Sequence, residues 1–158
     1  MSRGYTFIDR ESGGEDGDSD DDGDFVKGLV SVSMPFKGEK CDEIYRVIRT
    51  ECQSQGLHAQ RVDEYVASGV VLRDIARLIE QAEFLLFDLS GERQNVYYEL
   101  GYAHGIGNEA KEVLLIAEEG TTLHYDVAGL RVHFYKNVEQ LQQILAKGLA
   151  EMIKRCRS

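Results

Sequence analysis

The sequence lacks the features that mark membrane, secreted and disulfide-stabilised proteins. None of its apolar runs approaches the roughly 20 residues that span a bilayer. Residues 1–10 contain no basic region followed by an apolar stretch, so we find no secretory signal. The three cysteines are odd in number and do not have the paired spacing of metal ligands. We therefore expect a cytoplasmic protein with reduced thiols and no membrane partner.

Motifs for phosphate, metal and nucleic-acid binding are also missing. The chain contains neither a GxxxxGKS/T loop nor a GxGxxG fingerprint. His58, His124 and His133 are not spaced as metal ligands, and the acidic run DGDSDDDGD lacks the central Gly and terminal Glu of a calcium loop. No basic patch is present, which argues against a nucleic-acid backbone as partner. We therefore expect no metal, no cofactor and no nucleic acid.

Negative charge is concentrated at the N-terminus. Residues 1–24 contain nine acidic and two basic residues, a local charge of −7 within the net charge of −10. Apart from Arg10, the stretch from Asp9 to Asp24 consists of Gly, Ser, Asp and Glu and contains no large apolar residue. Such a segment cannot bury enough surface to offset the entropy lost on ordering. We predict a disordered acidic tail over residues 1–25 and one folded domain over residues 26–158.

In the folded part, segments typical of strands and helices alternate. Apolar runs predict strands over residues 28–36, 57–62, 84–89, 113–117 and 131–135. Apolar residues at helical spacing predict helices over residues 42–55, 70–82, 95–107 and 138–154. This alternation implies right-handed crossovers and a mainly parallel sheet covered on both faces. We predict an α/β fold with a flavodoxin-like, doubly wound sheet of five strands in the order 2-1-3-4-5.

Ligands of such sheets bind at the carboxyl ends of the strands, beside the switch point flanked by the first and third strands. Small, polar and acidic residues follow the strands at this edge. The candidate catalytic residues are Glu99 and Asp88. The candidate ligand-binding residues are Ser33, Met34, Pro35 and Phe36 after the first strand, Asp63 after the second, and Ser90, Gly91 and Asn95 after the third.

The expected position of Glu99 favours the ionised form of its carboxylate. If Asn95 caps the third helix, Glu99 lies about one turn from the positive end of the helix dipole, which favours the ionised carboxylate. Retaining glycosyl transfer needs such a carboxylate, because it attacks an anomeric carbon and forms a glycosyl ester. The alternative is that Glu99 only favours the start of the helix.

Asp88 ends a buried strand, where a charge is costly unless it is paired or functional. Its carboxylate is suited to accept hydrogen bonds from ribose hydroxyls. The alternative is a turn cap, in which the backbone N–H groups of Ser90 and Gly91 donate to it. Asp63 has the same two interpretations, with a nearby cation as its partner in the second. His104 lies on the helical face of Leu100, so we expect it to be partly buried and not catalytic.

The run F-D-L-S-G-E-R-Q-N-V-Y-Y-E-L-G-Y-A-H-G-I-G (Phe87 to Gly107) decides between these alternatives. It resembles the segment D-L-S/T-G-x-x-x-N-V-F/Y-Y-E-L-G-x-A-H of nucleoside 2-deoxyribosyltransferase-like proteins and of predicted nucleotide-binding TIR-like proteins. V-S-M-P-F (residues 32–36), R-V-D-E (61–64) and L-H-Y-D-V (123–127) support the resemblance, which covers about residues 28–136.

The resemblance implies the flavodoxin-like sheet and gives Glu99 a role. In the deoxyribosyltransferases the Glu of the matching E-L-G-Y-A is the nucleophile that takes the sugar from a base. TIR-type NAD-cleaving domains place a Glu at the corresponding helix start, where it attacks or stabilises the ribose that carries nicotinamide. By this analogy Asp88, Asn95 and the loop from Ser33 to Phe36 hold ribose, base or phosphate. Relatives commonly complete their sites across subunits, which implies a homo-oligomer.

The sequence departs from both groups near Glu99. Deoxyribosyltransferases usually carry an Asp a few residues before the nucleophile, where this chain has Arg93, Gln94 and Asn95. Arg93 suits a phosphorylated ligand. The Trp-Cys pair common in TIR NADases is replaced by Tyr97 and Tyr98.

Two functional hypotheses follow from these residues. The first is an enzyme that cleaves or transfers at the N-glycosidic bond of a nucleoside, nucleotide or NAD-like compound. The second is a non-catalytic nucleotide-sensing module of the TIR-like type. Both have a small-molecule ligand as the partner.

Overall fold

A computed structural model describes residues 25–62, 72–106, 112–124 and 127–158 of the chain. The predicted acidic tail covers residues 1–25. Residues 1–24 lie outside the described part, and Phe25 is exposed. The strands are β1 (Val26–Ser33), β2 (His58–Arg61), β3 (Ala82–Asp88), β4 (Glu112–Glu118) and β5 (Val132–Tyr135). The helices are α1 (Glu39–Ser54), α3 (Leu72–Gln81), α4 (Gln94–Gly105) and α5 (Val138–Arg157), with a short 3₁₀ turn η1 (Ser90–Glu92).

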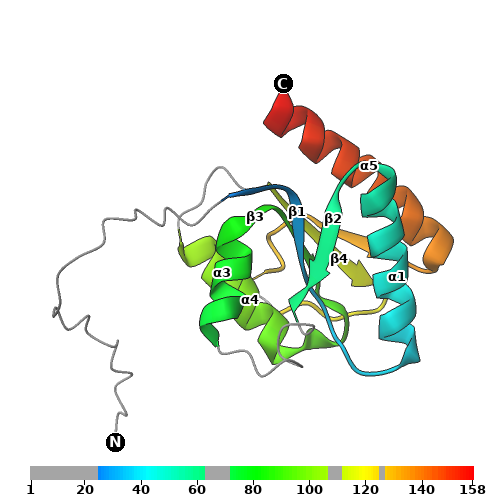
Figure 1. The fold of residues 1–158 in the computed structure, drawn as a ribbon. Coiled ribbons are helices and arrows are strands. Elements are labelled where there is room, and N and C mark those ends of the chain that lie inside the picture. Colours follow the sequence, from blue (N-terminus) through cyan, green and yellow to red (C-terminus); the bar gives the residue numbers. More distant parts are fainter. Residues whose placement is uncertain (1–24, 63–71, 107–111, 125–126) are drawn as a thin grey trace, which may run out of the picture.

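The five strands form one parallel sheet in the order β2-β1-β3-β4-β5. Helices α3 and α4 lie on one side of the sheet, and α1 and α5 lie on the other (Figure 1). The predicted flavodoxin-like α/β fold is therefore confirmed. The strand order reverses between β1 and β3, so the loops after these two strands meet at the switch point.

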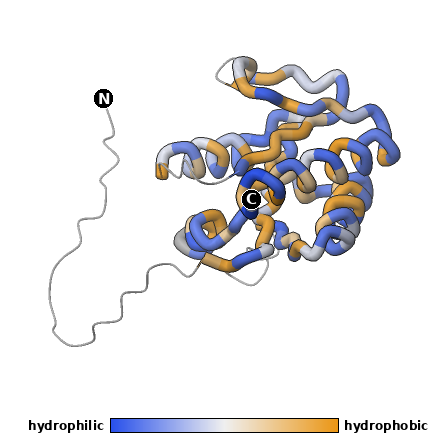
Figure 2. The backbone as a smooth tube through the Cα atoms, turned by 90° about the horizontal axis from the view of Figure 1, so that it is seen from above, coloured by the Kyte–Doolittle hydropathy of each residue, from blue (hydrophilic) through white to orange (hydrophobic). Residues whose placement is uncertain are grey.

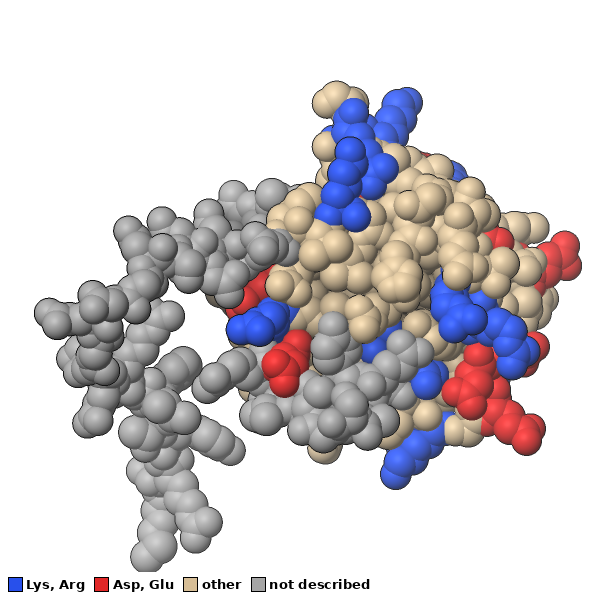
Figure 3. Space-filling model, in the orientation of Figure 1, with Lys and Arg blue, Asp and Glu red and all other residues tan. Residues whose placement is uncertain are grey.

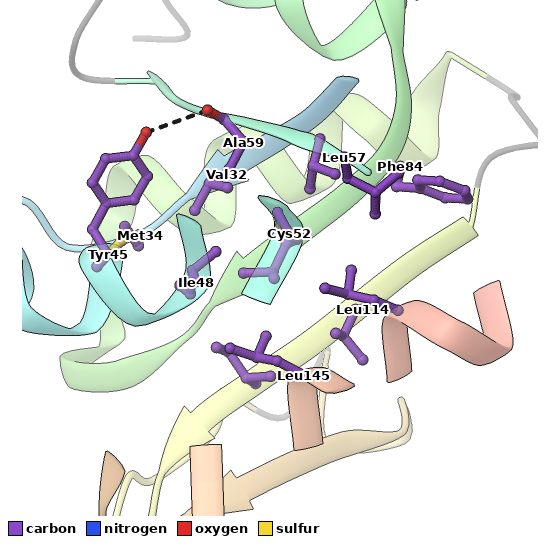
Figure 4. Packing of buried hydrophobic residues seen from close by; sticks show 14 of the residues in the cluster. Val32, Met34, Tyr45, Ile48, Cys52, Leu57, Ala59, Phe84, Leu114 and Leu145 are labelled. Carbon is purple, nitrogen blue, oxygen red and sulfur yellow. Dashed lines mark hydrogen bonds between the residues drawn. The ribbon is translucent and has the colours of Figure 1, made fainter. Parts of the chain in front are cut away.

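Each face of the sheet has its own hydrophobic core. Strand residues alternate between the faces, so Phe84 and Leu86 pack toward α1 and α5, whereas Leu85 and Phe87 pack toward α3 and α4. The most hydrophobic stretches run along the strands between the helices (Figure 2). In the α1 and α5 core, Ile48 packs beside its helix neighbour Cys52 (Figure 4). All seven residues of β3 are buried, as expected for a central strand covered on both sides.

The cysteines are free, as predicted. Cys52 is buried, Cys41 is half-buried and Cys156 is exposed. Burial raises the pKa of the Cys52 thiol to about 12, so this thiol packs as an apolar group. Among the described helices, none has the length and apolar character needed to span a bilayer.

The last helix runs to Arg157, three residues beyond the predicted end. Its final turn contains Lys154, Arg155 and Arg157, which complement the negative end of the helix dipole. Figure 3 shows basic side chains gathered over this end of α5. Arg157 forms a two-pronged ion pair with Glu83, at 3.1 Å from Nε and 2.8 Å from Nη2. These charges explain why the helix continues past its last buried residue, Met152.

Glu83 is a buried carboxylate at the amino end of β3. It is 6% exposed and also accepts a 2.5 Å hydrogen bond from the Gly28 backbone N–H. The hydrogen bonds from Arg157 hold the pKa of Glu83 below its usual range against the opposing effect of burial. Because the folded-state pKa is depressed, this carboxylate contributes stability above its unfolded pKa of about 4.3, and the contribution is lost as the pH falls through the folded pKa.

We predict that Arg157→Gln lowers the urea midpoint of unfolding more than Arg155→Gln does. Both arginines form two-pronged ion pairs, but Arg155 pairs with the less buried Glu112. Removing Arg157 leaves the Glu83 carboxylate buried without its main partner, which is the more unfavourable state. The midpoints are measured at pH 7 and pH 3.5, and the difference between the variants should shrink at the lower pH. Equal midpoints of the two variants at pH 7 would contradict the assignment of Arg157 as the main partner of Glu83.

Candidate functional site

The loop after β1 and the start of α4 enclose a small pocket at the switch point. The pocket has a volume of about 180 Å³. Its lining residues come from these two segments and are Pro35, Phe36, Lys37, Arg93 and Asn95. The structure therefore brings together three of the predicted ligand-binding residues (Pro35, Phe36 and Asn95) although 59 positions separate Phe36 from Asn95. The Phe36 ring is 44% exposed, so a planar group has access to it.

Two cations line this pocket. Lys37 and Arg93 make no ion pair within the part of the chain that the structure describes. Other cations at the same edge are paired, since Lys40 binds Glu118 and Arg61 lies 3.3 Å from Asp42. The pocket is thus a place where two positive charges remain available to an anion. Lys37 was not among the predicted ligand-binding residues, although its position directly after Phe36 was the available signal.

Helix α4 begins one residue earlier than predicted. Arg93 occupies the N-cap position with extended backbone angles, and no side chain caps the helix. The prediction that Asn95 caps α4 is therefore wrong: Asn95 is the second helical residue and its side chain lines the pocket. The cap position falls on Arg93 because the chain is still extended there when it leaves η1.

Glu99 lies about one and a half turns into α4. It is 6% exposed, on the inward side of the helix that also carries Val96 and Ala103. Asn95 and Glu99 are four residues apart and share one side of the helix. Asn95 is exposed at the pocket, whereas Glu99 is buried one turn further along. Glu99 itself is not among the residues that line the pocket.

The residues at the end of β1 divide between the two faces of the sheet. Ser33 is fully buried, and its Oγ makes no hydrogen bond to any described residue. By strand alternation Ser33 lies on the same face as α4. Met34 is 4% exposed and belongs to the core under α1, where it lies beside Tyr45 (Figure 4). The predicted contact of Met34 with a ligand is not supported, because the side chain fills the core.

Asp88 is held in a hydrogen-bond network within the protein. Its Oδ1 accepts from the Ser90 N–H at 2.9 Å and from the Ser90 hydroxyl at 2.5 Å, and its Oδ2 accepts from the Tyr135 hydroxyl at 2.9 Å. Burial raises the pKa of Asp88, and the bonds from Ser90 and Tyr135 oppose this shift. This arrangement matches the turn-cap interpretation, with Ser90 as the donor in the turn.

The network also separates Asp88 from Glu99. Tyr135 belongs to the core on the α1 and α5 face, so Asp88 points to that face. Glu99 comes from α4 on the opposite face. The two carboxylates predicted to be catalytic do not form a facing pair. Sequence reasoning also missed Tyr135, whose only signal was its place at the end of a strand.

Ser90 and Gly91 shape the turn after β3. The Ser90 hydroxyl also accepts a 2.7 Å hydrogen bond from the Glu118 N–H and thereby ties this turn to β4. Gly91 has a φ of 71°, in the left-handed region that favours glycine. Both residues hold the turn that leads into α4, and neither lines the pocket beside Phe36. The predicted site residue Asp63 lies outside the described residues.

The prediction that His104 is partly buried is wrong, because this residue is exposed. It lies one turn after the buried Leu100, in the last turn of α4. In the parts of the chain that the structure describes, no group of three His, Cys, Asp or Glu side chains is arranged to hold a metal ion.

No protein-family model matches the chain, and no curated protein matches its sequence. Solved structures do match its fold. A variant of a flavo-diiron protein from Thermotoga maritima aligns with 82% of the chain at 16% identity and a TM-score of 0.59. The constitutive lysine decarboxylase of E. coli aligns with 81% of the chain at 15% identity and a TM-score of 0.52. The chain spans 37% of the first protein and 18% of the second. At such low identity the likeness shows the fold alone.

Proposed function

We propose that this protein cleaves or transfers at the N-glycosidic bond of a nucleotide-like small molecule, with Glu99 as the nucleophile or cation stabiliser. The observation that carries the proposal is the position of Glu99, one helical turn beyond the pocket residue Asn95 at the switch point. A ligand seated against Phe36 and Asn95 would present its sugar toward this part of α4. The resemblance to nucleoside 2-deoxyribosyltransferase-like and TIR-like proteins assigns the same role to Glu99.

The chemistry needs one carboxylate that can reach the sugar. The Glu99 carboxylate forms an ester bond to the anomeric carbon while the bond from that carbon to the base nitrogen breaks. The base leaves with the bonding electron pair: the base of a nucleoside or nucleotide takes up a proton from water, whereas the positively charged nicotinamide of an NAD-like compound leaves neutral and needs none. Water, or a second base in a transfer reaction, then displaces the carboxylate and restores the free enzyme.

The test is a search for released base. The full chain is incubated separately with nucleosides, nucleoside monophosphates and NAD, and free base is measured by mass spectrometry. Release that is proportional to protein concentration supports the proposal. Absence of release from all three classes under conditions where they bind would overturn it.

We expect a phosphorylated substrate, because Lys37 and Arg93 leave two cations in the pocket. Lys37→Ala and Arg93→Ala should each raise KM for a nucleoside monophosphate by about tenfold, the loss typical of one charge-assisted hydrogen bond. KM for the matching unphosphorylated nucleoside should change little. Lys40→Ala is the control, since Lys40 pairs with Glu118 and does not line the pocket. Equal losses with both substrates would contradict the assignment of a phosphate to these cations.

One observation favours the alternative of a non-catalytic sensing module. Glu99 is 6% exposed and does not line the pocket, so a nucleotide held there need not reach its carboxylate. A sensor would show ligand-induced thermal stabilisation in the wild type without release of base. The proposed assembly into a homo-oligomer, with sites completed across subunits, is checked by light scattering of the full chain.

A further inference from the structure

A second pocket lies on the other side of α4 from the one beside Phe36. It has a volume of about 700 Å³, within the range of small-molecule sites. Gln94, Tyr97, Gly101 and His104 of α4 form one side of it, at the spacing of a single helix stripe. Residues of the segment between β4 and β5, among them Leu130, form the other side.

Gly101 keeps the helix side of this pocket open. Glycine is a poor residue for the interior of a helix, and no neighbour among the described residues requires it at this position. A Cβ atom added to Gly101 would meet no atom of the described residues within 4 Å. Since Gly101 lines the pocket, a larger side chain would project into the pocket without displacing any described part of the protein.

The walls of the pocket are apolar and aromatic. Leu100 and Val127 are buried beneath it, and Leu130 is 38% exposed at its edge. The rings of Tyr97 and His124 meet edge to face, with centroids 6.2 Å apart and an angle of 62° between their planes. The Tyr97 hydroxyl accepts a 3.4 Å hydrogen bond from the His124 N–H, which links the β4–β5 segment to α4. Such walls favour a planar aromatic ligand.

The charges of the lining residues restrict further the kind of ligand that this pocket can bind. No Lys or Arg is among its described lining residues, in contrast with the pocket that contains Lys37 and Arg93. The polar side chains that line it are those of Glu92, Gln94, Tyr97, His104 and His124, and Glu92 is the one carboxylate among these described residues. Glu92 has a φ of 47°, an uncommon backbone conformation for a residue with a side chain. A carboxylate repels phosphates and accepts hydrogen bonds from amino groups.

We propose that this pocket binds an uncharged, amino-substituted heteroaromatic compound, stacked on Tyr97 and hydrogen-bonded to Glu92. The proposal does not involve Glu99 and does not depend on the proposed enzymatic function.

The test uses 2-aminopurine, a neutral and fluorescent amino-heteroaromatic base, titrated into the full chain. Stacking on an aromatic side chain should quench its fluorescence in a saturable way. Gly101→Leu places a side chain against the wall formed by α4 and should weaken binding by about tenfold or more, the loss expected for one stacked base. Gly105→Leu is the matched control, because Gly105 also lies in α4 with open space around it but does not line the pocket. Both substitutions improve helix propensity, so neither variant should unfold at a lower temperature than the wild type.

Saturable quenching that Gly101→Leu removes and Gly105→Leu retains supports the proposal. The absence of saturable quenching would overturn it, as would quenching that persists in Gly101→Leu. Binding that is lost in Asn95→Ala but retained in Gly101→Leu would place the base in the pocket beside Phe36, and would also overturn the proposal. Base release by Glu99 is measured separately, so the failure of one proposal is distinguishable from the failure of the other.

Discussion

Glu99→Gln is expected to reduce the release of free base by about three orders of magnitude, within the range for loss of a catalytic group. The amide has the size of the carboxylate but cannot form the glycosyl ester, so the chemical step fails while the ligand still fits. The expected pattern is therefore a large fall in kcat with ligand binding nearly unchanged. Turnover is measured by mass spectrometry of released base, and binding by ligand-induced thermal stabilisation.

Glu112→Gln is the control for this substitution. It makes the same chemical change on β4, at the amino end of the strands, where Glu112 pairs with Arg155. Turnover in this variant should equal that of the wild type. If Glu99→Gln kept wild-type turnover while its fold and binding were intact, the carboxylate would not be the nucleophile. The glycosidic mechanism would then have to be abandoned.

The fold was predictable because its signals are long and local. The run FLLFDL has the length and apolar character of a central strand, and its first five residues lie in the fully buried β3 (Ala82–Asp88). The apolar residues of the last helix recur at helical spacing, and Leu141, Leu145 and Leu149 are buried in α5. Alternation of such segments requires parallel crossovers, which leaves few possible sheet orders.

The details of the site depend on features that such patterns do not contain. The cap of α4 lies only two residues before the predicted one, at Arg93 instead of Asn95, yet this shift moves the side chain of Asn95 from the cap to the pocket. Whether Asp88 faces α4 or α1 depends on strand alternation counted to the last residue of β3. The closeness of Lys37 and Arg93 arises only when the loop after β1 meets α4 in three dimensions.

Asp88 is expected to stabilise the fold and to play no part in the chemical step. Asp88→Ala should lower the free energy of unfolding by about 2–4 kcal/mol, because it leaves the buried donors of Ser90 and Tyr135 without an acceptor. Asp88→Asn keeps one oxygen for the Ser90 N–H, and the Tyr135 hydroxyl can turn to accept from the amide. The free energy of unfolding of this variant at pH 7 should be lower than that of the wild type by about 1 kcal/mol or less. Urea unfolding measures the free energy of both variants.

The pH dependence of stability separates the effect of the Asp88 charge from the effect of the shape of its side chain. Burial raises the folded-state pKa of Asp88, so the protonated carboxyl is the form that the fold prefers. Its contribution to stability is fully present below the unfolded pKa of about 3.9, and it is lost as the pH rises through the folded pKa. The side chain of the Asp88→Asn variant cannot ionise. The difference in free energy of unfolding between this variant and the wild type should therefore change in favour of the variant as the pH is raised from 4.5 to 7.5. If the Asn variant instead matched the wild type in stability at both pH values but lost base release, Asp88 would act on the substrate, and the turn-cap role would be secondary.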